Sequence, residues 1–273
     1  MRPSPRFEIA PGLTGFRTVM VNFFFASSLE SPKRWVLVDA GLRGSGPRIA
    51  HEAELCFGRD NPPQAIVLTH GHFDHTGALP WLARRWSVPI YAHAAELPFL
   101  NRLEPYAAPD PSVGGGLLAL LSPLYPTRPT KLPVPVSPLP ADGTVPGLPE
   151  WKWLATPGHS PGHISFWRPF DRVLISGDAL ISTRQESLFA VWQQKIEVRP
   201  PPAYFTPDWR AAFDSLQRLR ALSPALAATG HGLPLRREGW LQELDTLLSD
   251  FDRRGLPRQG RYVPETRERP ALA

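Results

Sequence analysis

The sequence has 273 residues, of which 42% are hydrophobic, and its 30 basic and 25 acidic residues give a formal net charge of +5. This length fits one large domain or two small ones with a sizeable core, and the single cysteine, Cys56, excludes an intramolecular disulfide. No apolar run is long enough to span a bilayer, and no apolar secretory segment follows Met1. We therefore expect one cytoplasmic domain over residues 1–273, with no membrane partner and with Cys56 buried as a packing residue.

Short runs rich in β-branched and aromatic residues predict seven strands. They lie at residues 17–25, 34–39, 65–69, 88–92, 163–167, 172–176 and 226–229. Apolar residues at helical spacing predict helices at residues 45–57, 79–86, 207–222 and about 240–251. For the third of these helices, Thr206 is the expected N-cap and Pro207 the first helical residue. Strands and helices are interspersed in two halves of similar size.

A proline-rich insertion at about residues 105–149 interrupts this pattern. It holds 12 of the 34 prolines and three consecutive glycines at 114–116. Proline at this density excludes a long helix or a central strand, and long irregular insertions are usually lids, binding loops or linkers. We expect a lid that selects the substrate. The alternative is a segment that packs on the outer helices or forms a homodimer interface.

An arginine-rich tail begins at about residue 252. It contains Arg253, Arg254, Arg258, Arg261, Arg267 and Arg269 against three acidic residues. Such an excess is compatible with a nucleic-acid partner, but no aromatic residues are interleaved with the arginines as in a strand-binding surface. We therefore expect a solvated tail and no nucleic-acid partner.

Four candidate metal ligands fall within six residues, directly after the apolar strand at 65–69. They are His70, His72, Asp74 and His75. The end of a strand is a place where side chains can converge on one point, and Gly71 allows a tight turn between two of the candidates. Burying three imidazoles and a carboxylate without a metal would be costly. Imidazole and carboxylate ligands without a thiolate suit zinc, and also iron or manganese.

Three further candidates have the same setting at strand ends or glycine turns. His159 lies in Thr-Pro-Gly-His-Ser-Pro-Gly-His, Asp178 in Ser-Gly-Asp-Ala, and His231 in Thr-Gly-His-Gly. Seven candidate ligands in four loops are what two adjacent metal ions need. His163 is expected to support the site without binding metal, whereas His51 and His93 fit no loop of the pattern and are left outside it.

Taken together, these motifs resemble the metallo-β-lactamase superfamily, and most closely its glyoxalase II and lactonase branch, over roughly residues 17–240. The resemblance implies an α+β four-layer αββα sandwich with two divalent metal ions, most simply Zn²⁺, at one edge between the sheets. It implies that His70, His72 and His159 hold the first ion, that Asp74, His75 and His231 hold the second, and that Asp178 bridges them. Asp39, at an early strand end, has the family's usual position for orienting the metal loop.

Two adjacent cations lower the pKa of a shared water and give a bridging hydroxide at neutral pH. Hydrolysis of an ester-like small molecule is therefore the leading function, with Asp74 and Asp178 as the catalytic residues that the resemblance implies. Two alternatives stay open. A mononuclear-iron persulfide dioxygenase would use only His70, His159 and Asp178, and a phosphodiesterase or nuclease would have the same fold.

Residues that could select the substrate are less clearly marked. Tyr204 and Phe205 could line the cleft, with aromatic packing at a helix start as the alternative. The segment 185–187 follows the Asp178 loop and could face the site or form a surface loop.

Overall fold

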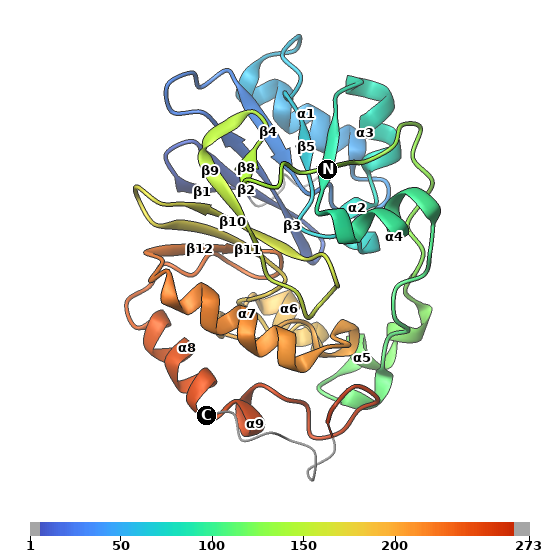
Figure 1. Ribbon diagram of the computed structural model, residues 1–273, viewed down its shortest axis with the longest axis vertical. Coiled ribbons are helices and arrows are strands. Elements are labelled where there is room, and N and C mark those ends of the chain that lie inside the picture. The colour runs from blue at the N-terminus through green and yellow to red at the C-terminus, as the bar shows by residue number, and fades with distance from the viewer. Residues whose placement is uncertain (1–5, 265–273) are drawn as a thin grey trace.

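A computed structural model describes residues 6–264 and contains two β-sheets that lie face to face (Figure 1). The first sheet has seven strands in chain order: β1 (Arg6–Ala10), β2 (Leu13–Thr18), β3 (Val21–Ser27), β4 (Trp35–Val38), β5 (Ile66–Val67), β6 (Ile90–Ala92) and β7 (Ser137–Pro138). The second has five strands in the order β12 (Leu226–Thr229), β11 (Val173–Gly177), β10 (Ile164–Arg168), β9 (Leu148–Ala155) and β8 (Thr144–Val145).

Helices cover the outer face of each sheet. Ile49 of α1 (Gly46–Phe57) and Leu82 of α3 (Leu79–Trp86) pack with the first sheet, for example with Leu37. Helices α7 (Trp209–Ala221) and α8 (Trp240–Ser249) pack in the same way on the second sheet. A third apolar core, which includes Phe24 and Phe166, fills the space between the sheets. This arrangement confirms the predicted αββα sandwich (Figure 1).

Parallel strand pairs bring the expected metal loops to one edge of the sandwich. Strand β5 pairs with β4 and β6 in parallel, and β11 pairs with β12 in parallel. The loops that follow β11 and β12 therefore leave the second sheet side by side, joined by a 2.8 Å hydrogen bond from Gly230 N to Gly177 O.

Three predicted elements are wrong in their bounds. The strand expected at 17–25 is divided by a turn in which Val19 has a φ of 58°, so that β2 and β3 form an antiparallel pair. Helix α7 begins at Trp209 with Asp208 as its N-cap, instead of at Pro207 with Thr206 as its N-cap. The last predicted helix is divided into α8 and α9 (Phe251–Arg254).

The proline-rich insertion contains short elements only. It includes η2 (Pro111–Val113), α5 (Leu117–Leu120) and η3 (Ser122–Leu124), and it then supplies β7, β8 and the first residues of β9. The remaining elements are η1 (Ala94–Glu96), α2 (Phe73–Thr76), α4 (Leu97–Arg102), α6 (Leu188–Gln193) and η4 (Ala203–Phe205).

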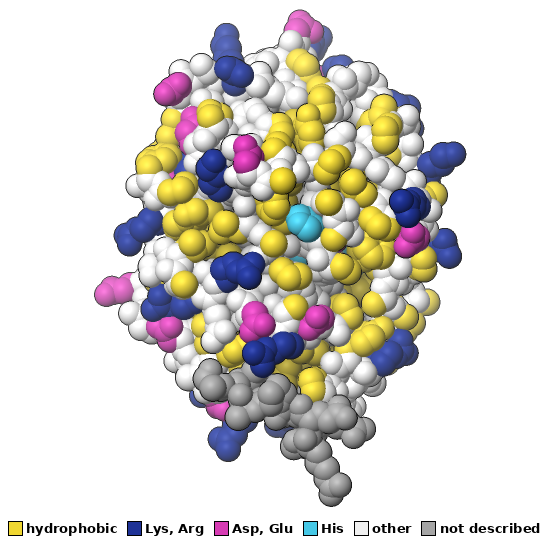
Figure 2. Space-filling model, viewed as in Figure 1, with side chains coloured by type: hydrophobic (Ala, Val, Ile, Leu, Met, Phe, Trp, Pro, Cys, Tyr) yellow, Lys and Arg dark blue, Asp and Glu magenta, His cyan; other side chains and the backbone are white. Residues whose placement is uncertain are grey.

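Charges of both signs are spread over the molecular face in Figure 2 and do not gather in one stripe. Arg267 and Arg269 of the predicted tail, like Met1, lie outside the described residues. Among residues 6–264, no helix has the length and apolar character that crossing a bilayer requires.

Candidate metal centre

The seven predicted ligands come together at the edge where the two sheets meet. His70 and His72 lie in the loop after β5, while Asp74 and His75 lie in the short helix α2 that follows it. The other three ligands come from loops of the second sheet, with His159 between β9 and β10, Asp178 after β11 and His231 after β12. All seven side chains are buried.

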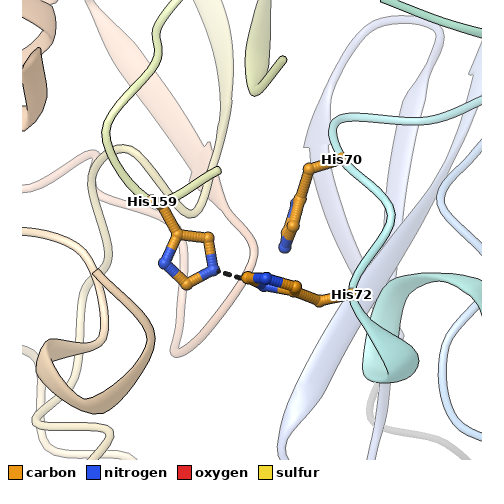
Figure 3. A group of neighbouring side chains, drawn as sticks. All are labelled: His70, His72 and His159. Carbon is orange, nitrogen blue, oxygen red and sulfur yellow. Dashed lines mark hydrogen bonds between the residues drawn. The ribbon is translucent and has the colours of Figure 1, made fainter. Parts of the chain in front are cut away.

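The candidate ligands form three groups that share members, and within each group the ligand atoms lie within 4.8 Å of one another. They are His70, His72 and His159; His70, His75 and Asp178; and Asp74, His75 and His231. In Figure 3 the rings of the first group point toward a common centre, with His72 Nδ1 and His159 Nε2 2.9 Å apart. Asp178 lies between the outer groups, because its Oδ2 is 3.4 Å from His159 Nε2 and 3.0 Å from His231 Nε2.

Hydrogen bonds to protein oxygens fix the orientation of two rings. His75 Nδ1 is 2.8 Å from Asp39 Oδ2, and His231 Nδ1 is 2.7 Å from the carbonyl oxygen of Met20. Because these oxygens only accept, each Nδ1 donates. In the neutral ring, the lone pair is then on Nε2, which faces the centre. Metal-binding histidines are usually held in this way.

Three buried atoms at the centre make no hydrogen bond with any described residue. They are His70 Nε2, His75 Nε2 and Asp178 Oδ1. An unpaired buried polar atom costs about 1–3 kcal/mol, and all three atoms belong to predicted ligands. Nitrogen and oxygen donors without a thiolate are a set that zinc, iron and manganese accept. The residues present therefore fit a metal site.

The protonation of the cluster follows from burial and from its carboxylates. Burial lowers the pKa of His72 to about 3, so this ring stays neutral and available as a ligand. Burial acts in the same direction on His75, but Asp178, Asp39 and Asp74 together raise the pKa of His75 well above its usual value. Asp178 and Asp74 likewise raise the pKa of His231 against the effect of burial. Bound cations would replace the protons that these two rings carry.

Asp39 has the orienting role that the sequence suggested. It is fully buried at the end of β4, where its Oδ1 accepts from Thr69 N at 2.8 Å and its Oδ2 accepts from Thr69 Oγ1 at 2.8 Å. The same Oδ2 accepts from His75 Nδ1, and Thr69 Oγ1 lies 3.1 Å from His70 Nδ1. One carboxylate thus orients His75 directly and His70 through Thr69.

His163 also supports the site without facing the metal centre. Its Nε2 accepts a 2.9 Å hydrogen bond from Asp178 N, and its Nδ1 lies 2.9 Å from Thr156 Oγ1. Both ring nitrogens are therefore engaged by protein atoms, and His163 holds the loop that carries Asp178.

Glu96 is a functional residue that the sequence pattern did not reveal. Its buried carboxylate accepts hydrogen bonds from Gly71 N at 2.9 Å, from Ser160 Oγ and Gly162 N at 2.8 Å each, and from Tyr106 Oη. Glu96 therefore ties the loop of His70 and His72 to the loop of His159. The signal available in the sequence was an acidic residue near the end of a predicted strand, which is too common to be selective.

Aromatic residues form one wall beside the centre. Phe205 stacks on His72 with ring centroids 4.8 Å apart, and Tyr204 packs on Tyr125 at 5.8 Å. Tyr125 also approaches Phe73 at 5.5 Å. Tyr204 and Phe205 are both buried in this wall, and Phe205 is in direct contact with a predicted ligand.

The remaining candidates lie away from the ligands or differ from expectation. Gln185 and Glu186 are buried, so the 185–187 segment is not a surface loop. Cys56 is only half-buried in α1, where it packs against the first core. His51 is exposed on α1, and His93 caps η1 by accepting from Ala95 N, in agreement with their exclusion from the site.

Comparisons with known proteins agree with this geometry. The family model described as the metallo-beta-lactamase superfamily matches residues 20–231. The chain is 42% identical over 247 residues to the probable metallo-hydrolase YflN of Bacillus subtilis (strain 168), covering 90% of this chain and 94% of that protein. It is 32% identical to the probable metallo-hydrolase YybB of the same organism, covering 72% and 74% of the two chains.

A solved structure gives the same result at the level of the fold. TTHA1623, described in a di-iron-bound form, is 26% identical to this chain with a TM-score of 0.54, and the match covers 84% of this chain and 94% of that one. From the αββα sandwich, the buried histidine and aspartate cluster and these matches, we conclude that the chain belongs to the metallo-beta-lactamase superfamily and is a metallo-hydrolase of that family.

Proposed function

We propose that the protein is a dinuclear metal-dependent hydrolase that acts on a small ester-like molecule, such as a thioester or a lactone. The observation that carries this proposal is the convergence of seven buried imidazole and carboxylate side chains in overlapping groups. His70, His72 and His159 would hold one ion, Asp74, His75 and His231 would hold the other, and Asp178 would bridge them. We propose zinc as the metal, and the iron in TTHA1623 makes iron the alternative to test.

When bound, the two ions would supply an activated water and would polarise the electrophilic oxygen of the substrate. Asp74 is the residue that we assign as proton acceptor, because its side chain is 12% exposed whereas that of Asp178 is 2% exposed. In the metal-free protein, burial raises the pKa of the Asp74 carboxyl group. In the metal-free protein, burial also acts to raise the pKa of Asp178, but His231 and His75 lower it well below its usual value and keep this carboxylate anionic before a metal binds.

The surroundings of the site support a small organic substrate. Phe205, Phe73 and Tyr125 form a continuous aromatic wall that begins at His72, and apolar walls with a few polar groups are typical of small-molecule sites. On the face drawn in Figure 2, the interspersed charges are unlike the basic stripe that nucleic-acid binding needs. We therefore favour an ester, thioester or lactone over a phosphodiester.

Metal quantification on His231→Ala tests the dinuclear assignment. The wild type should contain two ions per chain, and the variant should keep the ion at His70, His72 and His159 but lose the other. His51→Ala is the matched control, because His51 is exposed on α1, and it should keep both ions. Two ions in His231→Ala, or one ion in the metal-replete wild type, would contradict the proposal.

Substrate and oxygen assays then separate the functions. Turnover of lactones or thioesters by the two-metal protein is the expected result. One iron per chain together with oxygen consumption would instead indicate the persulfide dioxygenase, and exclusive cleavage of phosphodiesters would indicate the nuclease alternative.

A further inference from the structure

A cavity apart from the predicted metal ligands lies between the loop that follows β11, the proline-rich insertion and the C-terminal segment. Its volume is about 530 Å³, and none of the seven predicted metal ligands lines it. Small-molecule sites usually have volumes of about 300–1,000 Å³. We call this cavity the arginine pocket, because five arginines line it: Arg184, Arg199, Arg253, Arg254 and Arg258.

The walls of the arginine pocket are fixed by hydrogen bonds between distant parts of the chain. Gln259 Nε2 donates to Ser112 O at 2.8 Å, and Tyr262 Oη donates to Ala108 O at 2.8 Å. In Figure 1 the red segment after α9 accordingly runs beside the green insertion. On the inner side, Gly115 has a φ of +90° and lies so close to Glu186 that an added Cβ would be 2.8 Å from the Glu186 Cβ. Three segments of the chain therefore meet at the pocket, and hydrogen bonds and close packing hold them together.

Two arginines of the pocket share one carboxylate through long contacts. Arg184 Nη2 and Arg199 Nη1 both approach the same oxygen of Glu197, at 3.5 and 3.4 Å. By contrast, Arg220 makes a two-pronged ion pair with Asp245, at 2.6 and 2.9 Å. A guanidinium group carries five N–H donors, so Arg184 and Arg199 keep most of their donor capacity.

The other three arginines are similarly short of partners. Arg253 Nε and Arg254 Nε share Asp250 at 3.9 and 3.5 Å. Within the described part of the chain, Arg258 has no ion pair. Among the described residues that line the pocket, only Glu186 is acidic, and it already accepts a 2.7 Å hydrogen bond from Ala203 N. Five arginines thus line the pocket. Four of them share the carboxylates of Glu197 and Asp250, and Glu186 is in the wall, which leaves an excess of positive charge.

We propose that the arginine pocket binds a small anion that carries a phosphate or carboxylate group. The planar guanidinium fork matches both groups and can bind either of them through two parallel hydrogen bonds. The described residues that line the pocket include no aromatic side chain, and strands of nucleic acid are bound largely by stacking on such side chains. The concave shape and the charge therefore favour a small anion. This inference is independent of the metal chemistry.

Titration calorimetry with inorganic phosphate and with succinate, at low ionic strength, tests the proposal on the metal-loaded protein. Arg258→Gln is the main variant, since Arg258 is exposed and its loss leaves no carboxylate unpaired. Arg210→Gln is the control. It removes the same charge from an exposed position on α7, outside the pocket. We expect Arg258→Gln to weaken binding about tenfold, as the loss of one charge-assisted hydrogen bond predicts, and Arg210→Gln to leave it unchanged.

Anion binding at the metal ions does not confuse this comparison, because it is common to all three proteins. If Arg258→Gln weakens the binding of phosphate more than that of succinate, the ligand is a phosphorylated one, and the reverse order would identify a carboxylate. Equal dissociation constants for the two variants, or no saturable binding of either probe to the wild type, would overturn the proposal. Melting temperatures of the variants verify that both are folded.

Discussion

Asp39 and Glu96 position the predicted metal ligands from outside the cluster, and both do so as pure acceptors. Asp39 accepts from Thr69 and His75, and Glu96 accepts from two backbone amides and two hydroxyl groups. A carboxylate offers acceptor sites only, whereas an amide of the same shape offers donors at one end. An amide at either position would therefore turn an N–H group toward another donor.

Replacing Glu96 with glutamine should weaken metal binding about 10–100-fold, the usual cost of losing a residue that orients metal ligands. In either orientation of the glutamine side chain, its NH₂ group faces the backbone N–H of Gly71 or of Gly162. A backbone N–H group cannot accept a hydrogen bond. The measurement is metal affinity by competition with a chelator. Melting temperature should fall as well, because an unpaired buried donor costs about 1–3 kcal/mol.

Glu150→Gln is a suitable control for Glu96→Gln. Glu150 Oε1 accepts from Ser28 Oγ and Leu29 N, while its Oε2 has no partner among the described residues. The amide can therefore place its NH₂ group at the free position, and metal affinity should stay at the wild-type value. Equal affinities in the two variants would show that Glu96 does not position the ligands.

At the scale of elements, the sequence predicts most helices and strands but not the local choices between equivalent residues. Thr206 and Asp208 are both good N-cap types. Thr206 Oγ1 instead donates to Pro202 O at 2.8 Å across the turn η4, so Asp208 becomes the cap and accepts from Ala211 N at 2.9 Å. The turn at Val19 could not be predicted either, because it contains no glycine, proline or asparagine.

The insertion is expected to act on substrate choice through Tyr125. This side chain packs on Phe73 and Phe205, and Phe205 stacks on His72. Tyr125→Ala should therefore widen the aromatic wall without removing a metal ligand. We expect the ratio of kcat/KM values for a large and a small ester to change about tenfold, as a change of pocket size usually allows, while metal content stays at two ions.

Leu124→Ala provides the comparison for Tyr125→Ala. Leu124 directly precedes Tyr125 in the chain, but it is 78% exposed and does not belong to the aromatic wall. Its substitution should leave the ratio unchanged. A lid function for the insertion would be rejected if Tyr125→Ala had the same substrate preference as Leu124→Ala.

At the scale of the whole molecule, the features that the sequence predicts are those carried by short motifs. The ligand cluster at 70–75 and the loops around 159, 178 and 231 specify the fold and the site together, because each motif directly follows or adjoins a strand. Glu96 and the arginine pocket depend on contacts between distant segments. Glu96 bonds to Ser160, and Tyr262 bonds to Ala108. A periodic pattern in the sequence holds no information about such pairs.

Four buried histidines make the stability of the metal-free protein depend on pH. Burial lowers the pKa of His70, His72, His159 and His163, to about 3 for His72 and about 4 for His163. An unfolded histidine has a pKa of about 6.5. Between pH 6.5 and about 4, the unfolded chain therefore takes up protons that the folded chain excludes, and stability decreases as pH falls.

The remaining buried groups do not reverse this dependence. His75 and His231 have a raised pKa, so they favour the folded state as pH falls toward about 6.5, and well below that pH they are charged in both states and contribute no further slope. Burial raises the pKa of Asp74 and Glu96, which favours the folded state as pH falls. Two carboxyl groups thus raise the free energy of unfolding as pH falls, whereas four histidines lower it. Each histidine can lower it by up to about 2 kcal/mol over this interval.

We therefore expect the metal-free protein, prepared with a chelator, to melt at a lower temperature at pH 5 than at pH 7. The measurement is thermal unfolding followed by circular dichroism. In His163→Asn the fall should be smaller, because one of the four neutral histidines is absent, whereas in His51→Asn it should match the wild type, since His51 is exposed in both states. A melting temperature at pH 5 that equals or exceeds the value at pH 7 would show that these four buried imidazoles are not neutral in the folded, metal-free protein.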